Sequence, residues 1–439
     1  MSAKVGLHHF RHVDDSRGEA ARIHLRVDPD GAGTLIVNAN RVVHLNPTAT
    51  EIAHMILEGK SDVEVVRELT RAYAVSRSVA NRDVPALRNQ LRELIRPDGA
   101  CPVHELSLET VAPFSARPSA PYRMDLAVTY RCNNACAHCY NARPRQHPEL
   151  PTAVWFEILD RLWSLGVPHV VFTGGEATLR NDLPELIAHA EGNGQITGLN
   201  TNGRRLADRE YLRALVDAGL DHVQITLESS DESIHDGMMG RSGAFRQTVA
   251  GLRNALDSRL FVMTNTTMLE TNRHTIGETL DFLHEVGVPT VGLNALIYSG
   301  GGLAVGTGLP ERDLQPLLDL AVEKTSQHGQ ALIWYTPTQY CAFDPTQANL
   351  GVKGCTAALY SMCIESDGKV LPCQSYYHPV GDFRADAWDS IWNHELCTRL
   401  RERAVLPTKC HGCPIMAECG GGCPLRFEMS PAAALTEVA

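Results

Sequence analysis

In this 439-residue chain, the clearest sign of a chemical site is the spacing of three cysteines. Cys132, Cys136 and Cys139 form the pattern C-x₃-C-x₂-C and directly follow the apolar run 125–130. That run reads as a short buried strand, so the cysteines would lie in a loop at its C-terminal end. Three thiolates on one loop can hold three irons of a cubane cluster, which leaves the fourth iron open to another ligand. A zinc site is the alternative, because cysteines at x₂ spacing also suit zinc.

The segment from about 122 to 340 has to position this loop, and it alternates short apolar strands with amphipathic helices. Successive strands start roughly 25 to 40 residues apart, the length of a βα unit, which predicts a parallel sheet of at least six strands, curled or doubly wound. Loops at the C-terminal ends of such strands carry the chemistry. The expected strands are 126–130, 169–173, 196–201, 222–227, 260–265, 290–295 and 331–335.

Several of these strand ends bear groups that could contact a small ligand. After the second strand, a glycine pair would let the backbone approach a ligand closely, and the carboxylate that follows could accept from an ammonium group. The polar groups after the third and fourth strands could contact a ligand or simply cap the next helices. The residues are Gly174, Gly175 and Glu176, then Asn200, and then Thr226 and Glu228.

The cysteine loop resembles that of the radical S-adenosylmethionine (SAM) enzymes, whose signature is C-x₃-C-x-aromatic-C, with His138 in the aromatic slot. The resemblance implies an α/β fold, an incomplete (β/α)₆ barrel open on one side. It also implies a [4Fe–4S] cluster whose open iron chelates SAM through its amino and carboxylate groups. Electron transfer would then cleave SAM to a 5′-deoxyadenosyl radical that abstracts hydrogen from a substrate.

The same resemblance suggests SAM contacts at the strand ends. Gly174-Gly175-Glu176 looks like the segment that holds the SAM amino group, with Ala177 where the family commonly has proline. Thr226-Leu227-Glu228 is similar to the family's S-x-D segment. Asn200, Thr226 and Glu228 would then suit the ribose and the carboxylate-bearing tail of SAM.

Eight of the thirteen cysteines lie between 351 and 423, with Gly368-x₄-Cys373 and Cys410-x₂-Cys413-x₅-Cys419-x₃-Cys423 among their spacings. These spacings resemble the SPASM extension of radical SAM enzymes, which binds auxiliary [4Fe–4S] clusters; a structural zinc ribbon is the alternative. By resemblance, the first auxiliary cluster has a full set of ligands, and the second has three. The first set is Cys355, Cys363, Cys373 and Cys423, and the second is Cys410, Cys413 and Cys419.

The usual fourth ligand of the second cluster falls beyond Cys423, where this sequence has no further cysteine. Cys397 or Cys341 could supply it, an oxygen ligand such as Glu428 could replace it, the position could stay open, or the cluster could be lost. Cys341 and Tyr340 follow the seventh strand, near the expected barrel mouth. Either could quench or relay a radical, and a buried thiol without a role is the alternative for Cys341.

Residues 20–96 form a small winged-helix-like α+β domain, with a hairpin of 34–37 and 41–45 followed by three helices. Thr48 with Glu51 and Ser61 with Glu64 have capping-box spacing. This segment resembles the PqqD family, which binds the leader of a precursor peptide. The peptide would add a strand at the hairpin edge beside a helix. A helical cap without a ligand is the alternative.

The composition, with 44% hydrophobic and 21% charged residues, is that of an ordinary globular protein. The net charge of -11 argues against a nucleic acid or an anionic membrane as main partner. No apolar run approaches the roughly 18 residues that span a bilayer, and the N-terminus lacks the apolar core of a signal peptide. We therefore expect a cytoplasmic protein whose cysteines serve metal or redox chemistry rather than disulfides.

The expected organisation is a leader-recognition domain at 20–96, a proline-rich linker at 97–121 that contains Cys101, the barrel at 122–340 and the SPASM domain at 341–430. The resemblance to these families implies a maturase that abstracts hydrogen from a ribosomally made peptide, with a flavodoxin or ferredoxin as reductant. Auxiliary clusters would carry away an electron when a crosslink forms. A small-molecule substrate, such as a porphyrin or an amino-acid-derived metabolite, and an iron–sulfur scaffold without turnover are the alternatives.

Overall fold

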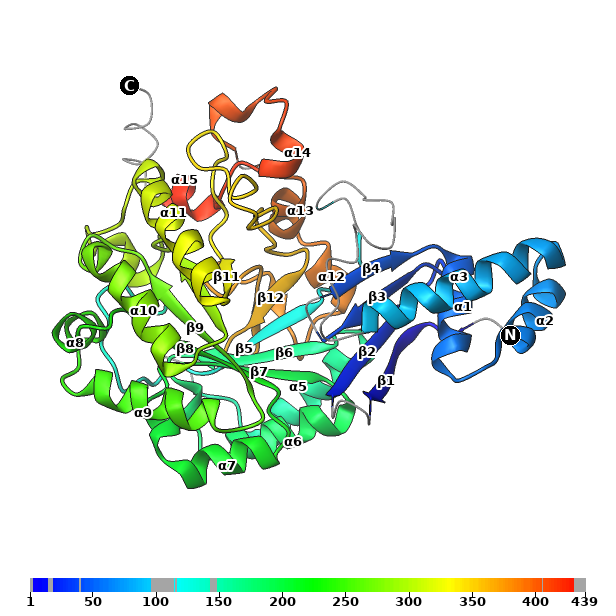
Figure 1. Ribbon diagram of the computed structural model, residues 1–439, viewed down its shortest axis with the longest axis horizontal. Coiled ribbons are helices and arrows are strands. Elements are labelled where there is room, and N and C mark those ends of the chain that lie inside the picture. Colours follow the sequence, from blue (N-terminus) through cyan, green and yellow to red (C-terminus); the bar gives the residue numbers. More distant parts are fainter. Residues whose placement is uncertain are drawn as a thin grey trace. The chain divides into compact units, whose positions relative to one another are not determined.

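The computed structural model describes residues 3–14, 19–38, 41–95, 114, 117–142, 148–404 and 406–429 (Figure 1). Cys101 and most of the expected linker lie outside the described residues. The chain divides into two compact units. The smaller one holds Met1–Tyr122 with the short pieces Asp160–His169 and Gly194–Ile196, and the larger one holds the rest. No helix in the described ranges is long and apolar enough to cross a membrane.

The N-terminal segment forms a four-stranded antiparallel sheet in the order β1-β2-β3-β4, followed by three helices. The predicted hairpin is confirmed as β3 and β4, but β1 and β2 were not anticipated. In β2, Ile23, Leu25 and Val27 alternate with arginine and histidine, and the resulting pattern was not recognised as a strand. The elements are β1 (Gly6–Asp14), β2 (Glu19–Val27), β3 (Gly33–Val37), β4 (Arg41–Leu45), α1 (Pro47–Leu57), α2 (Asp62–Ala72) and α3 (Arg77–Ile95).

Only one of the two predicted capping boxes forms. The Ser61 hydroxyl accepts from the backbone N–H of Glu64, and the Glu64 carboxylate accepts from the backbone N–H of Ser61 at 2.8 Å, so α2 begins as expected. The prediction for Thr48 is wrong. Pro47 occupies the first helical position, which proline favours, so the preceding Asn46 caps α1 and accepts from the N–H of Ala49 at 2.9 Å.

The larger unit is built on a ten-stranded sheet in the order β11-β10-β9-β8-β7-β6-β5-β12-β13-β14, counted over the described residues. All seven strands predicted for the barrel are present and consecutive in this sheet. The strands from β7 to β11 pair in parallel throughout. Their bounds are β5 (Arg123–Thr129), β6 (His169–Gly174), β7 (Ile196–Thr201), β8 (His222–Thr226), β9 (Phe261–Thr267), β10 (Thr290–Asn294) and β11 (Ala331–Trp334).

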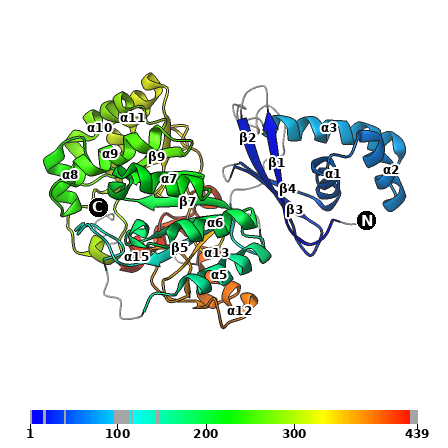
Figure 2. The same ribbon diagram turned by 90° about the horizontal axis from the view of Figure 1, so that it is seen from below.

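Helices connect these strands and cover the outer side of the curved sheet, as Figures 1 and 2 show for α6 to α11. Leucine, isoleucine and valine side chains from strands and helices are fully buried between the two layers. The arrangement is the predicted partial (β/α) barrel. The helices are α5 (Thr152–Ser164), α6 (Leu183–Asn193), α7 (Arg209–Asp217), α8 (Glu232–Met239), α9 (Ala244–Leu256), α10 (Ile276–Val286) and α11 (Glu311–His328).

The cysteine-rich tail continues the barrel sheet. Its first strand, β12 (Ser361–Ile364), runs parallel to β5, and β13 (Lys369–Leu371) and β14 (Gly381–Asp382) add antiparallel strands. The predicted hairpin between Cys363 and Cys373 is confirmed as β12 and β13. Four short helices complete the tail: α12 (Trp388–Trp392), α13 (Glu395–Arg401), α14 (Met416–Cys419) and α15 (Pro424–Met429).

Candidate functional site

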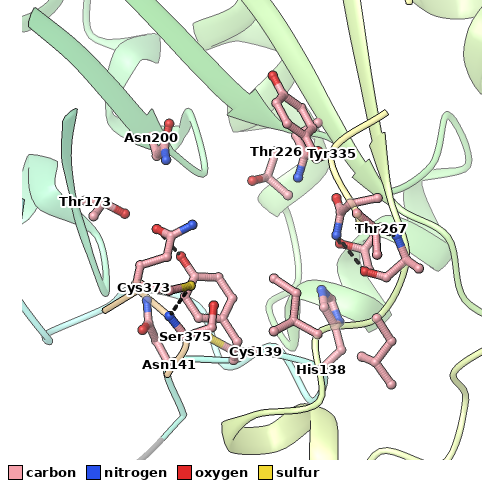
Figure 3. Close-up of a pocket in the computed structure, with 18 of the residues that line it drawn as sticks. His138, Cys139, Asn141, Thr173, Asn200, Thr226, Thr267, Tyr335, Cys373 and Ser375 are labelled. Atoms are coloured by element: carbon pink, nitrogen blue, oxygen red, sulfur yellow. Dashed lines mark hydrogen bonds between the residues drawn. The ribbon is translucent and has the colours of Figure 1, made fainter. Parts of the chain in front are cut away.

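A cavity of about 370 Å³ opens at the C-terminal ends of the barrel strands, where the sequence predicted the chemistry. Figure 3 shows Thr173, Asn200 and Thr226 reaching into it from the strand ends, with His138, Cys139 and Cys373 facing them. Three tail cysteines share the cavity wall with the predicted loop and strand-end residues. The predicted residues in the lining are Cys132, Cys136, His138, Cys139, Gly174, Gly175, Glu176, Asn200, Thr226, Glu228, Cys355, Cys373 and Cys423.

The cysteine loop is fastened to the end of α8. The backbone N–H of Ala135 donates to the carbonyl of Met239 at 2.9 Å, and the Cys136 sulfur lies 3.5 Å from the Met239 sulfur. Burial raises the pKa of the Cys136 thiol well above its ordinary value, and the charge of Cys139 raises it further. Such a thiol is neutral alone, whereas coordination to a metal deprotonates a thiol outright. The donor set therefore fits an iron–sulfur cluster.

The Gly-Gly segment lies directly against the strand end that leads into this loop. The N–H of Gly175 donates to the carbonyl of Thr129 at 2.7 Å, and the N–H of Glu176 donates to the carbonyl of Arg131 at 2.9 Å. Gly174 has φ +126°, and a Cβ there would lie 2.0 Å from the Thr129 oxygen. A Cβ at Gly175 would lie 2.4 Å from the Arg131 oxygen. Only glycine fits at either position.

The Glu176 carboxylate is buried and bonded within the protein. It accepts from the Thr201 hydroxyl at 2.7 Å, the Thr178 hydroxyl at 2.7 Å and the backbone N–H of Asn202 at 2.8 Å. These bonds join the end of β6 to the end of β7 and hold the carboxylate at the cavity wall. The sequence indicated a carboxylate at this edge but not the protein groups that donate to it.

His138 and Glu228, which the sequence selected separately, form an ion pair. The ring Nε2 of His138 lies 3.0 Å from Glu228 Oε1, and the other carboxylate oxygen accepts from the N–H of Thr267 at 2.7 Å. Burial lowers the pKa of His138, but its hydrogen bond to Glu228 and the Glu228 charge outweigh burial, so the pKa is raised. The pair ties the cysteine loop to the ends of β8 and β9.

Sequence reasoning missed two residues that hold the cysteine loop from the β7 side. The Asn202 side-chain amide donates to Asn133 Oδ1 at 2.7 Å, and Arg204 donates to the Asn133 carbonyl at 2.6 Å and to Asn134 Oδ1 at 2.7 Å. The available signal was the polar run that follows the predicted strand 196–201. It contains an arginine, a side chain with several hydrogen-bond donors.

Of the four cysteines of the first expected auxiliary cluster, Cys355, Cys373 and Cys423 are half-buried and line the cavity, and Cys363 is buried. Burial is the main cause that raises the pKa values of Cys355, Cys363 and Cys423, and negative charge at Cys373 raises each of them further. Cys363 lies opposite Asp125 across β12 and β5 and is fully buried. In the part of the chain that the structure describes, no three His, Cys, Asp or Glu side chains converge as the ligands of a single ion would.

The remaining candidate residues of the tail differ in their surroundings. Cys410 and Cys419 are buried, Cys413 is half-buried and Cys341 is exposed, so the buried-thiol alternative for Cys341 is wrong. Cys397 is fully buried on α13, where burial raises its pKa to about 11. Glu428 accepts from Arg399 at 3.3 Å and from the Tyr376 hydroxyl.

Three sequence families match this chain. The radical SAM superfamily matches residues 126–283, the iron–sulfur cluster-binding SPASM domain matches 355–414, and the PqqD family (coenzyme PQQ synthesis protein D) matches 26–94. The SAM-site and auxiliary [4Fe–4S] clusters and SAM are therefore the cofactors, in place of the zinc alternatives.

Known proteins resemble the chain over most of its length. The PqqA peptide cyclase of Xanthomonas campestris pv. campestris is 31% identical over 314 residues, which cover 69% of this chain and 82% of that protein. The Fe-coproporphyrin III synthase of Methanosarcina barkeri is 29% identical over 334 residues, with the same coverage of 69% and 82%.

The structure of Streptococcus suis SuiB bound to the precursor peptide SuiA covers 95% of this chain and 96% of that one, with a TM-score of 0.68 at 17% identity. At that identity the likeness concerns the fold. The shared fold extends over nearly the whole of both chains. By its sequence matches and its fold, this chain belongs to the radical SAM superfamily of enzymes, with an N-terminal PqqD domain and a C-terminal SPASM domain.

Proposed function

We propose that this enzyme modifies a ribosomally synthesised precursor peptide by hydrogen abstraction. The observation that carries the proposal is the PqqD domain at residues 26–94, joined in one chain to a cavity lined by loop and tail cysteines. A relative named PqqA peptide cyclase and a fold neighbour solved with a precursor peptide support it. A crosslink within the peptide is the expected product.

The residues that line the cavity would have different roles in the reaction. Cys132, Cys136 and Cys139 would hold the cluster at which SAM is bound and reductively cleaved to the hydrogen-abstracting radical. Gly174 and Gly175 would let backbone groups approach SAM. The strand-end side chains of Asn200 and Thr226 would bind its polar parts, and the His138–Glu228 pair would hold the loop in position.

The tail would take part in the oxidation of the peptide radical. Closing a crosslink after one hydrogen abstraction leaves one electron to remove, and clusters held by the tail cysteines would accept it. Three of those cysteines line the cavity itself, which keeps the transfer short. A flavodoxin or ferredoxin in the cytoplasm would supply the electron that starts each turnover.

The leader would bind at the edge of the N-terminal sheet. In the described residues β4 is an edge strand, with β3 as its neighbour, and an edge strand offers its backbone groups to an added strand. Helix α3 lies beside it, because the Arg41 guanidinium donates to the Leu94 carbonyl at 2.7 Å. Such a strand-and-helix edge suits β-augmentation by an extended peptide.

Mass spectrometry of a candidate precursor coexpressed with this enzyme tests the substrate. A crosslink removes two hydrogens, so the expected product is lighter than the precursor by about 2 Da, with the unmodified peptide recovered from cells that lack the enzyme. The relative named Fe-coproporphyrin III synthase makes a small-molecule substrate the second candidate. SAM cleavage that coproporphyrin species stimulate, and that precursor peptides do not, would favour it and contradict the peptide.

The β4 edge can be tested with two matched valines. Val42 on β4 is 39% exposed and Val63 on α2 is 73% exposed. Val42→Glu is expected to weaken leader-peptide binding roughly fivefold, because a cross-strand neighbour pair contributes up to about 1 kcal/mol. Val63→Glu should bind the leader like the parent. Fluorescence anisotropy of a labelled leader measures both, and equal affinities for the three proteins would rule out this edge.

A further inference from the structure

Cys419, one of the three cysteines of the second auxiliary set, lies next to the loop that follows β11. In this loop the backbone N–H of Tyr340 donates to the Cys419 sulfur at 3.3 Å, and the Cys419 thiol lies 3.8 Å from the Thr338 carbonyl. The Gln339 side-chain amide donates to the Gly421 carbonyl at 3.3 Å. An N–H directed at a cysteine sulfur is typical of sulfurs that bind iron.

Groups from α11 and from the tail hold this loop in position. The backbone N–H of Gln339 donates to a Glu311 carboxylate oxygen at 3.3 Å, and the other oxygen pairs with Arg426 at 3.0 Å. The Tyr340 hydroxyl accepts from the backbone N–H of Lys353 at 2.8 Å. These contacts come from three separate segments, so the loop is anchored independently of any cluster.

Cys341 is carried by this anchored loop. It follows Tyr340 directly and lies within a tight turn, because the N–H groups of Ala342 and Phe343 both donate to the Gln339 carbonyl, at 2.9 and 3.0 Å. The bond from the Tyr340 N–H to the Cys419 sulfur places Cys341, the next residue, close to that cysteine.

The other candidates for this position lie elsewhere. Cys397 is fully buried on α13, and the charged neighbour that affects its pKa is Arg401. The two Glu428 oxygens accept from Tyr376 and Arg399, in a network that contains none of the second set of cysteines. The loop that carries Cys341, in contrast, contacts Cys419 directly through the Tyr340 N–H.

We propose that Cys341 is the fourth ligand of the second auxiliary cluster, together with Cys410, Cys413 and Cys419. The cluster is then bound entirely by cysteine and has no open iron for the substrate, so it serves electron transfer. Its fourth ligand comes from the loop that follows β11, well before the other three ligands in the sequence. The inference rests on the auxiliary clusters and is independent of the substrate, so a failed peptide assay would leave it standing.

Thiol alkylation tests the proposal without any substitution. Cys341 is exposed, so iodoacetamide should label it in the apo-protein, and anaerobic reconstitution with iron and sulfide should protect it. The fully buried Cys397 is the internal control and should stay unlabelled in both states of the folded protein. Peptide mapping after alkylation gives both results. Labelling of Cys341 at the same rate with and without iron would overturn the proposal.

Variants provide the second measurement. In a background with alanine at Cys132, Cys136 and Cys139, the reconstituted full chain should hold about eight irons, as two [4Fe–4S] clusters. Adding Cys341→Ala should remove about one to four irons and convert the second cluster to a [3Fe–4S] form, visible by EPR in the oxidised state, or abolish it. Adding Cys397→Ala should change neither. Unchanged iron content and Mössbauer spectrum in the Cys341→Ala protein would contradict the assignment.

Discussion

Replacement of Cys136 by alanine is expected to abolish formation of 5′-deoxyadenosine from SAM, by at least about 100-fold. The loop has three cysteines for the cluster, and Cys136 is the one packed against Met239 at the centre of the loop. Without its thiolate, two protein ligands remain, and the cluster that binds and cleaves SAM is lost. Quantifying 5′-deoxyadenosine after anaerobic incubation with dithionite gives the activity. The iron content should fall by about four per chain.

The matched variant is Cys413→Ala, which removes a cysteine of the tail. Cys413 is absent from the cavity lining, and the three loop cysteines are part of it. This variant should therefore cleave SAM at about the parent rate. The cleavage should no longer lead to peptide modification, so no modified product forms. If both variants lose SAM cleavage equally, the tail cluster is structural. The proposal that the loop cysteines serve SAM cleavage and the tail cysteines serve electron transfer is then wrong.

Gly175→Ala should weaken SAM binding by about 100-fold, the penalty that a displacement near 1 Å can impose on a positioned site. The new Cβ would lie 2.4 Å from the Arg131 carbonyl oxygen and 2.7 Å from that of Tyr130. Both neighbours are backbone atoms, so they cannot rotate away, and the strand end that leads to Cys132 has to shift. Equilibrium dialysis of labelled SAM with the reconstituted protein measures the loss.

Gly192 on α6 is the control for this substitution. A Cβ there meets no atom within 4 Å, so Gly192→Ala should leave SAM affinity unchanged. Alanine should also stabilise the helix by up to about 1 kcal/mol. If Gly175→Ala binds SAM as tightly as Gly192→Ala does, the Gly-Gly segment is a plain turn and not part of the SAM site.

Much of the barrel could be predicted because each of its strands is marked locally. Apolar runs such as 169–173 and 222–227 are long enough to identify one by one, and the glycines that end the preceding helices mark where each begins. Parallel strands share an edge at their C-terminal ends, so the residues at the ends of neighbouring strands lie side by side. The bond from the Gly175 N–H to the Thr129 carbonyl joins the ends of β6 and β5 in this way.

The contacts that could not be predicted join residues far apart in the sequence. The His138–Glu228 pair spans 90 positions, and nothing local to either residue identifies its partner. The pairing of β12 with β5 is equally remote, and β12 is too short to be assigned to one particular neighbour. The Thr48 cap failed for a local reason, because Pro47 moved the start of the helix to Asn46.

The parallel pairing of β12 with β5 also has a consequence for protein engineering. Cys363 stands opposite Asp125 in that register, so the tail covers the side of β5 that faces away from β6. A chain cut before residue 355 would leave β5 as a bare edge, and bare edges pair with other chains and aggregate. In chimeras between relatives, the barrel and the tail should therefore be exchanged as one piece, with the crossover placed before β5.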